Sequence, residues 1–180
     1  FPEVGAQWVE VAGAHGMFDG VGSPLTQTSG VGVAQAISAA ELDQLEQFFL
    51  SRGAEVFHEV CPLADSSVFT LFKERGYQPI EFSNVLYRPI SPDLRLHATR
   101  NEQIKTRVIE KDETELWTQT SFEGWNEFPE YADFFRDLAE VNARSRGRLF
   151  LAELEGKTIA TGALTIAGDV ALLAGASTIP

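Results

Sequence analysis

The stretch Leu149-Phe-Leu-Ala-Glu-Leu-Glu-Gly-Lys-Thr-Ile-Ala-Thr-Gly-Ala-Leu-Thr-Ile166 decides the fold of the second half of the chain. Two apolar runs flank a short polar connection that contains Gly156, which is typical of an antiparallel hairpin. A third apolar run, Val170 to Ala176, follows directly after Gly168 and Asp169. We therefore expect three antiparallel strands that succeed one another along the chain.

Two helices are expected before this hairpin. Asp112 to Glu115 is an acidic run that suits the positive end of a helix dipole, and a helix through Trp117 follows it. Pro129 marks the beginning of a second helix, because proline lacks only an N–H group that the first helical turn leaves unpaired anyway. A strand from Ile104 to Ile109 comes before both helices. The predicted order is strand, helix, helix and three strands.

The first half contains signals for two further helices. Ser38 and Glu41 have the spacing of a capping box, in which each side chain accepts a backbone N–H of the first turn. The apolar face that follows ends at Gly53, a residue that readily adopts the left-handed conformation of a helix end. Asp65 can cap a second helix, which Gly76 ends.

Strand signals alternate with these helices. Trp8 to Val11 predicts a strand, and the glycine-rich stretch from Gly13 to Val33 has room for two short strands with their turns. Apolar and β-branched residues predict further strands at Glu55 to Val60 and at Ile80 to Tyr87. The predicted order is strands, helix, strand, helix, strand.

A linker divides the chain. The polar segment 91–103 follows Pro89 and interrupts the periodicity of both strands and helices. We therefore predict domains at 1–90 and 104–180, in a mixed α/β (α+β) fold with a mostly antiparallel sheet flanked by helices. Each half lacks elements that the other has, so we expect the halves to share one continuous sheet or to exchange strands between two copies.

Composition and charge restrict the class of protein. The 180 residues include 44% hydrophobic residues, which favours a globular protein with a real core. Fourteen Lys and Arg against 26 Asp and Glu give a net charge of -12, which disfavours nucleic acid and anionic membranes as partners. The single cysteine, Cys61, is typical of a reducing compartment, so we expect a cytoplasmic protein. The chain has no initiator Met and ends abruptly at Pro180, so we also expect a fragment.

The second half resembles the beginning of a GNAT-superfamily N-acetyltransferase. The resemblance rests on the strand Ile104 to Ile109, on two helices joined by the loop Phe122 to Glu127, and on the hairpin Leu151 to Gly162. The first half resembles the end of the same fold, because Leu71-Phe-Lys-Glu-Arg-Gly-Tyr77 is similar to the family pattern Leu-Tyr-x-x-x-Gly-Phe. The resemblance implies an acyl-CoA N-acyltransferase-like fold in tandem, with a degenerate first module and a second module truncated before its pyrophosphate loop.

The resemblance also implies an activity and some of its residues. It implies transfer of an acetyl group from acetyl-CoA to a small-molecule amine. The strand before the pyrophosphate loop supplies the backbone N–H that polarises the thioester in this family. Ser177, Thr178 and Ile179 hold that place here, so they are the candidate cofactor-binding residues. The catalytic acid of the family is a tyrosine further along the chain, so no catalytic acid or base is assigned.

The loop Phe122 to Phe128 is the candidate acceptor site. It is denser in aromatic and acidic residues than a surface connection needs, and the corresponding loop borders the amine pocket in the family. A carboxylate can attract a cationic amine and an indole ring can stack on it. The candidate substrate-binding residues are Glu123, Trp125, Asn126 and Glu127. Packing of the aromatic side chains at the junction of the two helices is an equally weighted alternative.

Gln27-Thr-Ser-Gly-Val-Gly32 is a second candidate for phosphate binding. It matches the pattern Gln-x-x-Gly-x-Gly, but five residues separate it from the helix cap at Ser38, and residues 1 to 51 contain no Lys or Arg. We favour a strand and turn in a degenerate module, which keeps a non-catalytic scaffold or dimerisation module as the alternative function. His15, His58 and His97 lack the spacing of metal ligands, so no metal is inferred, and a homodimer is a possible assembly.

Overall fold

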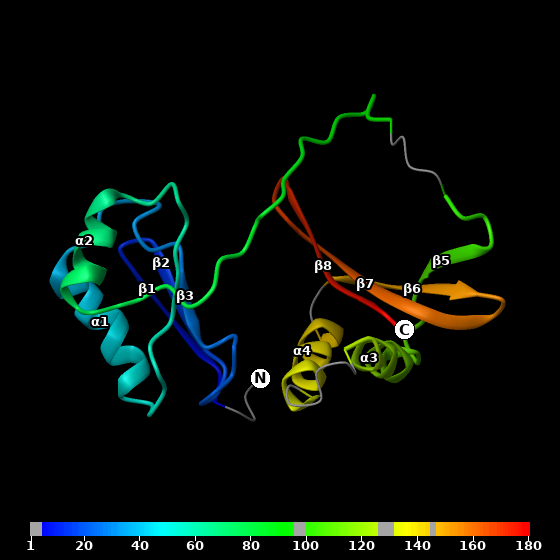
Figure 1. Cartoon of the computed structure of the whole chain (residues 1–180), viewed down its shortest axis with the longest axis horizontal. Coiled ribbons are helices and arrows are strands. Elements are labelled where there is room, and N and C mark those ends of the chain that lie inside the picture. The colour runs from blue at the N-terminus through cyan, green and yellow to red at the C-terminus, as the bar shows by residue number, and fades with distance from the viewer. Residues whose placement is uncertain (1–4, 96–99, 126–131, 145–146) are drawn as a thin grey trace. The chain divides into compact units, whose positions relative to one another are not determined.

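The structure is a computed structural model that describes residues 5–95, 100–125, 132–144 and 147–180. The chain divides into two compact units, Phe1–Pro89 and Ile90–Pro180 (Figure 1). Within the described residues, each unit contains a four-stranded sheet and two helices. The expectation of one sheet continuous through both halves is therefore wrong, because the strands of each half pair with one another.

The first unit has a sheet of short strands in the order β1-β2-β3-β4. The first two pairings are antiparallel, and the third is a parallel pairing. Burial alternates along β2, where Ala14, Gly16 and Phe18 are buried and the residues between them are exposed, so one face of the sheet is covered. The strands are β1 (Gln7–Val11), β2 (Ala14–Phe18), β3 (Gln27–Ser29) and β4 (His58–Glu59).

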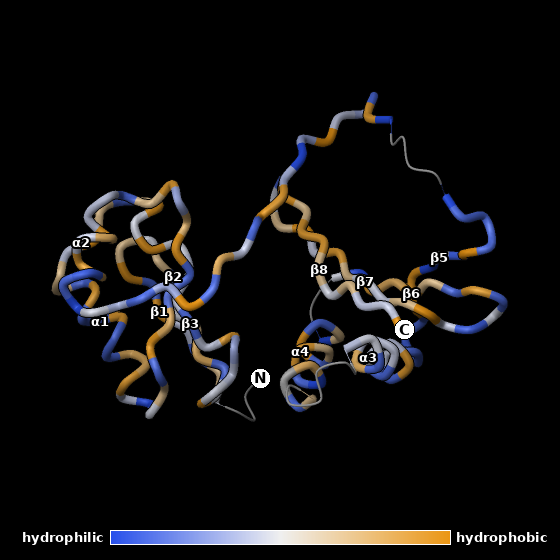
Figure 2. The backbone as a smooth tube through the Cα atoms, in the orientation of Figure 1, coloured by the Kyte–Doolittle hydropathy of each residue, from blue (hydrophilic) through white to orange (hydrophobic). Residues whose placement is uncertain are grey.

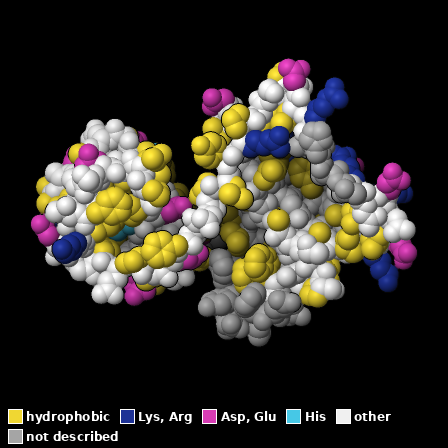
Figure 3. Space-filling model, turned by 45° about the horizontal axis from the view of Figure 1, so that its top comes forward, with side chains coloured by type: hydrophobic (Ala, Val, Ile, Leu, Met, Phe, Trp, Pro, Cys, Tyr) yellow, Lys and Arg dark blue, Asp and Glu magenta, His cyan; other side chains and the backbone are white. Residues whose placement is uncertain are grey.

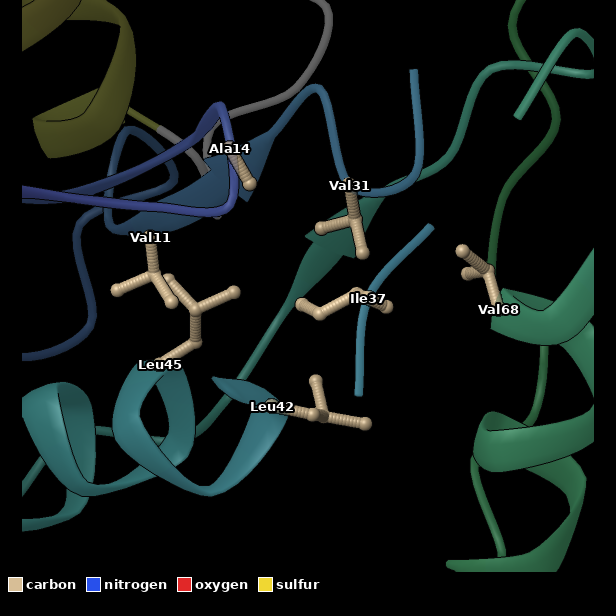
Figure 4. Packing of buried hydrophobic residues seen from close by; sticks show 7 residues of the cluster. All are labelled: Val11, Ala14, Val31, Ile37, Leu42, Leu45 and Val68. Carbon is tan, nitrogen blue, oxygen red and sulfur yellow. The ribbon is translucent and has the colours of Figure 1, made fainter. Parts of the chain in front are cut away.

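Two helices, α1 (Ala39–Leu50) and α2 (Ser66–Glu74), lie in this unit, and both begin where the sequence predicts. The Ser38 hydroxyl accepts the Glu41 N–H while the Glu41 carboxylate accepts the Ser38 N–H, so the capping box is complete. The Asp65 carboxylate caps α2. Both helices contribute to one core, which consists of Val11, Ala14, Val31, Ile37, Leu42, Leu45 and Val68 (Figure 4).

The strand predicted at Ile80 to Tyr87 is wrong, and the strand predicted at Glu55 to Val60 is reduced to β4. The strand β4 is short because β3 is short: the three residues of β3 offer β4 only two register partners, Thr28 and Ser29. Residues 80–87 form no strand pairing in the described part of the chain, and a β-forming sequence becomes a strand only where a neighbour supplies ladder partners. Figure 2 shows apolar residues along this connecting trace.

The second unit has a purely antiparallel sheet in the order β5-β6-β7-β8. This confirms the predicted meander. Glu155 and Gly156 both have positive φ, 52° and 78°, which is the conformation of a tight hairpin turn whose twist matches the strands that it joins. The strands are β5 (Ile104–Val108), β6 (Arg148–Leu154), β7 (Lys157–Ala167) and β8 (Val170–Thr178).

Helix α3 (Thr114–Glu123) packs on this sheet, and α4 (Ala132–Arg144) packs on α3 and contributes Ala139 to the same core. Trp117 is fully buried beneath them, and its Nε1 donates to the Phe150 carbonyl at 3.1 Å. The core consists of Trp117, Ala139, Leu149, Leu151 and Ala163. The predicted helix start at Pro129 lies outside the described residues.

An ionic cluster fixes the beginning of α3 to the sheet. The Arg107 guanidinium of β5 pairs with the Glu113 carboxylate at 2.5 Å and with the Glu153 carboxylate of β6 at 2.8 Å. Hydrogen bonds from Arg107 lower the pKa of Glu113 to about 2. This carboxylate is therefore ionised at any pH near neutrality.

Candidate functional site

The C-terminal end of α3 lies directly against the C-terminal end of β8. Gly124 ends the helix, and a Cβ atom added to it would collide with the Ser177 Oγ and lie 2.9 Å from the Thr178 backbone nitrogen. Only a glycine fits this contact without displacing the strand. The structure thus brings the loop predicted to bind substrate next to the strand predicted to bind the cofactor.

The polar groups at the end of β8 differ in what they already contact. The Ser177 hydroxyl is buried and donates to the Ser121 carbonyl at 2.7 Å, and the Ile179 N–H donates to the Ile159 carbonyl of β7 at 2.9 Å. Backbone N–H groups alternate in direction along a strand, so the N–H of Thr178 points away from β7. Of the three candidate positions, Thr178 therefore offers the main-chain donor directed away from the sheet.

The acceptor loop is described only in its first part. Glu123 is exposed, and its carboxylate accepts the Gln119 side-chain amide at 2.7 Å. The Trp125 ring stacks on the Phe135 ring of α4 with the centroids 4.5 Å apart, yet it remains 37% exposed. Trp125 thus packs at the helix junction and also presents a ring face or edge to solvent. Asn126 and Glu127 lie outside the described residues.

A bulge in β8 precedes the site. The register between β7 and β8 shifts between Thr161 and Ala163, opposite Gly175, whose φ is +59°. The Thr161 hydroxyl donates to the Gly175 carbonyl at 3.0 Å, which pins the irregularity. Bulges redirect the strand that follows them. The prediction of a regular strand missed this feature, although a glycine inside a strand is a known signal for it.

The glycine loop of the first unit has part of the geometry of a phosphate loop. It follows β3 and precedes α1, and β3 and β4 are parallel, as in folds that bind phosphate at a helix N-terminus. Gly30 and Gly32 have φ of +83° and +70°. However, the Asp65 N–H donates to the Gly32 carbonyl at 2.8 Å, and a Cβ on Gly32 would collide with Val68, so the loop is packed against α2.

The N-terminus of α1 already holds a negative charge. The Glu41 carboxylate accepts the Ser38 N–H at 2.8 Å and the Ser38 hydroxyl at 2.7 Å. The backbone hydrogen bond from Ser38, followed by the one from its side chain, holds the pKa of Glu41 below its usual value. An ionised carboxylate at this position repels a phosphate, and residues 1 to 51 offer no Lys or Arg to compensate.

A partly buried polar cluster in the first unit was not anticipated by the sequence analysis. The His58 Nε2 lies 3.3 Å from the Tyr77 hydroxyl, which donates to the Glu46 carboxylate at 3.0 Å. Glu46 also pairs with Arg75 at 2.5 Å, and the Phe72 ring stacks on the imidazole at 4.7 Å. Burial, assisted by the charge of Arg75, lowers the pKa of His58 to about 4. Phe72, Arg75 and Tyr77 lie within one short stretch, but Glu46 and His58 come from distant parts of the chain, so no local motif marks the whole cluster.

The described ranges contain no group of three or more His, Cys, Asp or Glu arranged to hold a metal ion. Over the same residues, no helix is both long and apolar enough to cross a bilayer.

Comparisons with known proteins give one kind of match. No protein-family model matches the chain, and no curated protein sequence matches it. Among solved structures, a GCN5-related N-acetyltransferase from Kribbella flavida matches with a TM-score of 0.66 and 18% sequence identity. The match covers 97% of this chain and 66% of that chain. This chain has an acyl-CoA N-acyltransferase-like fold. The predicted mixed α/β class is confirmed, and the chain spans just under two thirds of the length of its structural neighbour.

Proposed function

We propose that the protein is an N-acetyltransferase of the GNAT type, which transfers an acetyl group from acetyl-CoA to a small-molecule amine. The observation that supports it best is the contact of Gly124 with Ser177 and Thr178, in a fold shared with a GCN5-related N-acetyltransferase. The Thr178 N–H beside this contact is a main-chain donor that does not point toward β7, and such a donor is suited to a thioester carbonyl.

The proposed roles follow from the groups at the end of β8 and in the loop after α3. The amine nitrogen forms a bond to the thioester carbon, the C–S bond breaks, the amine loses a proton to a base, and the thiolate gains one. The Thr178 N–H would donate to the carbonyl oxygen, where negative charge develops during the attack. The exposed Glu123 carboxylate would attract a cationic amine, and the Trp125 ring would stack against it.

The first unit is assigned a non-catalytic role in this proposal. Its glycine loop is packed against α2, and the carboxylate of Glu41 occupies the N-terminus of α1. Both observations favour a scaffold over a second acyl-CoA site. Within this proposal, residues 1–90 correspond to the degenerate module, 91–103 to the linker, and 104–180 to the portion that carries the site.

A matched pair of glycine variants tests the site. Gly124→Ala in the full-length protein should reduce acetyl transfer to an amine panel by at least about 100-fold, because the added methyl displaces Thr178. Gly162→Ala is the control, since a Cβ at Gly162 meets no atom within 4 Å and the residue lies in the neighbouring strand β7. Thiol release reports the activity, and near-UV circular dichroism reports the fold. A folded Gly124→Ala protein with normal turnover would contradict the proposal.

Trp125→Ala tests whether the indole ring binds the amine substrate or only packs against α4. If the indole contacts the amine, the apparent KM for the amine should rise by about tenfold, whereas the KM for acetyl-CoA should change little. Trp8→Ala is the control, because Trp8 lies on the exposed face of the first unit. Unchanged kinetics together with a lower melting temperature would assign Trp125 to packing on Phe135 alone.

A further inference from the structure

Buried hydroxyl groups gather where α3 meets the sheet of the second unit. Within the described residues of this unit, the buried polar side chains are all hydroxyls, and they belong to Thr120, Ser121, Thr161 and Ser177. Figure 3 shows charged side chains at the surface of the same unit. A buried hydroxyl costs free energy unless it has a hydrogen-bond partner, so its partner indicates what it holds in place.

The hydroxyl of Ser177 joins β8 to α3. It donates to the Ser121 carbonyl at 2.7 Å. If the helix continued past Gly124, this carbonyl would accept the N–H of Trp125. That N–H donates instead to the Phe122 carbonyl at 3.0 Å. The strand thus supplies a partner for a carbonyl that the last turn of the helix does not use.

The pairing of β8 with β7 is irregular just before this point. The register shifts between Thr161 and Ala163, opposite Gly175 with its positive φ. A bulge interrupts the ladder and changes the direction of the strand that follows it. Beyond the bulge, the N–H of Ile179 donates to β7 at 2.9 Å, while the Ser177 hydroxyl holds the strand from the face that α3 covers. The end of β8 is therefore fixed from two directions.

We propose that Ser177 is a positioning residue for acetyl transfer, because its hydrogen bond to Ser121 sets where the Thr178 N–H lies relative to the end of α3. The inference rests on the proposed function, in which that N–H donates to the thioester carbonyl and the loop after α3 binds the amine. A misplacement of about 1 Å between groups that act on one reaction can cost about 100-fold in rate. The Ser177 hydroxyl acts through Thr178, since it is buried and already donates to the helix.

Two substitutions of Ser177 in the full-length protein test this role. Ser177→Ala removes the hydroxyl and should lower kcat for acetyl transfer by about tenfold or more, while the KM for acetyl-CoA changes by less than about threefold. The reason is that the Thr178 N–H acts mainly on charge that develops in the transition state. Ser177→Cys keeps a side chain of similar size with a weaker donor, so its kcat should lie between the two. A side chain that only filled space would leave Ser177→Cys with full kcat.

Thr120→Val is the matched control. Thr120 precedes Ser121 in α3, it is buried as Ser177 is, and its hydroxyl donates to the Leu116 carbonyl at 2.7 Å. This bond has the same length as that of Ser177, but it stays within the helix. Thr120→Val should therefore lower the melting temperature about as much as Ser177→Ala does, and it should leave kcat within about twofold of the unsubstituted value. Near-UV circular dichroism reports the fold of each variant.

The infrared band of bound acetyl-CoA, labelled with carbon-13 at the carbonyl, gives a readout separate from turnover. A hydrogen bond to the carbonyl oxygen lowers its stretching frequency. The band should therefore lie below its position in solution in the unsubstituted protein and in Thr120→Val, and it should return toward that position in Ser177→Ala.

The outcomes separate this role from the proposed function. A folded Ser177→Ala protein with normal kcat and an unshifted carbonyl band relative to the unsubstituted protein, or an equal loss of kcat in Thr120→Val, would overturn the role of Ser177 alone. If Ser177→Ala does not fold, full kcat in Ser177→Cys would overturn it. An unsubstituted protein that neither binds acetyl-CoA nor transfers its acetyl group would contradict the proposed function and this role together.

Discussion

Each unit places glycine next to a potential binding group, but the two units differ in whether that group already has a partner. In the first unit, Gly30 and Gly32 follow a three-residue strand, and the helix terminus beyond them is occupied by the carboxylate of Glu41. In the second unit, Gly124 lies against the end of a nine-residue strand, directly beside the exposed Thr178. The comparison teaches that a glycine-rich pattern indicates a binding site only where the groups beside it are free to take a ligand.

The two units have separate hydrophobic cores, and the prediction with the largest expected effect tests whether these cores unfold independently. Trp117→Ala removes the ring beneath α3 and its hydrogen bond to Phe150, which should cost about 4 kcal/mol. Amide exchange should accelerate in β6 and β7, while the amides of α1 keep their protection because Leu42, Leu45 and Phe49 belong to the core clusters of the first unit. Uniform loss of protection in both units would show that the two cores are one cooperative unit.

The second prediction compares the response of the units to acid. His58 has a folded pKa of about 4 and an unfolded value near 6.5, so the unfolded chain binds more protons between these values. The first unit should therefore lose up to about 3 kcal/mol as the pH falls from about 6.5 to 4, and regain it above 6.5. In the second unit, the pKa of Glu113 is lowered to about 2, so its contribution is lost only below about pH 4.5.

Urea unfolding at several pH values, followed by amide exchange in each unit, measures this difference. His58→Gln should flatten the pH dependence of the first unit between 6.5 and 4 and leave that of the second unit unchanged. Equal acid sensitivity of the two units in the unsubstituted chain would contradict the assignment of the dependence to His58.

The sequence allowed the regular elements to be predicted because their signals are local. The capping box at Ser38 and Glu41 and the hairpin turn at Glu155 and Gly156 each lie within four residues. Features that depend on distant partners could not be predicted. The failure of Ile80 to Tyr87 to form a strand depends on which edge is available to it.

Candidate site residues show the same limit. The family resemblance singled out Ser177, Thr178 and Ile179 at and just after the end of β8, but only the structure shows that the hydroxyl of Ser177 and the N–H of Ile179 already have partners. The contact of Gly124 with Thr178 joins residues 54 positions apart, and no periodicity encodes it. The binding roles of these residues remain predictions.

One measurement tests the central claim, that acetyl-CoA is bound at the end of β8 and not at the glycine loop of the first unit. Amide exchange of the full-length protein is compared with and without saturating acetyl-CoA. We predict slower exchange at residues 176–179 and 120–125, with no change over residues 30–41. Protection of residues 30–41 without protection at Thr178 would contradict the account and would assign acyl-CoA binding to the loop of Gly30 and Gly32.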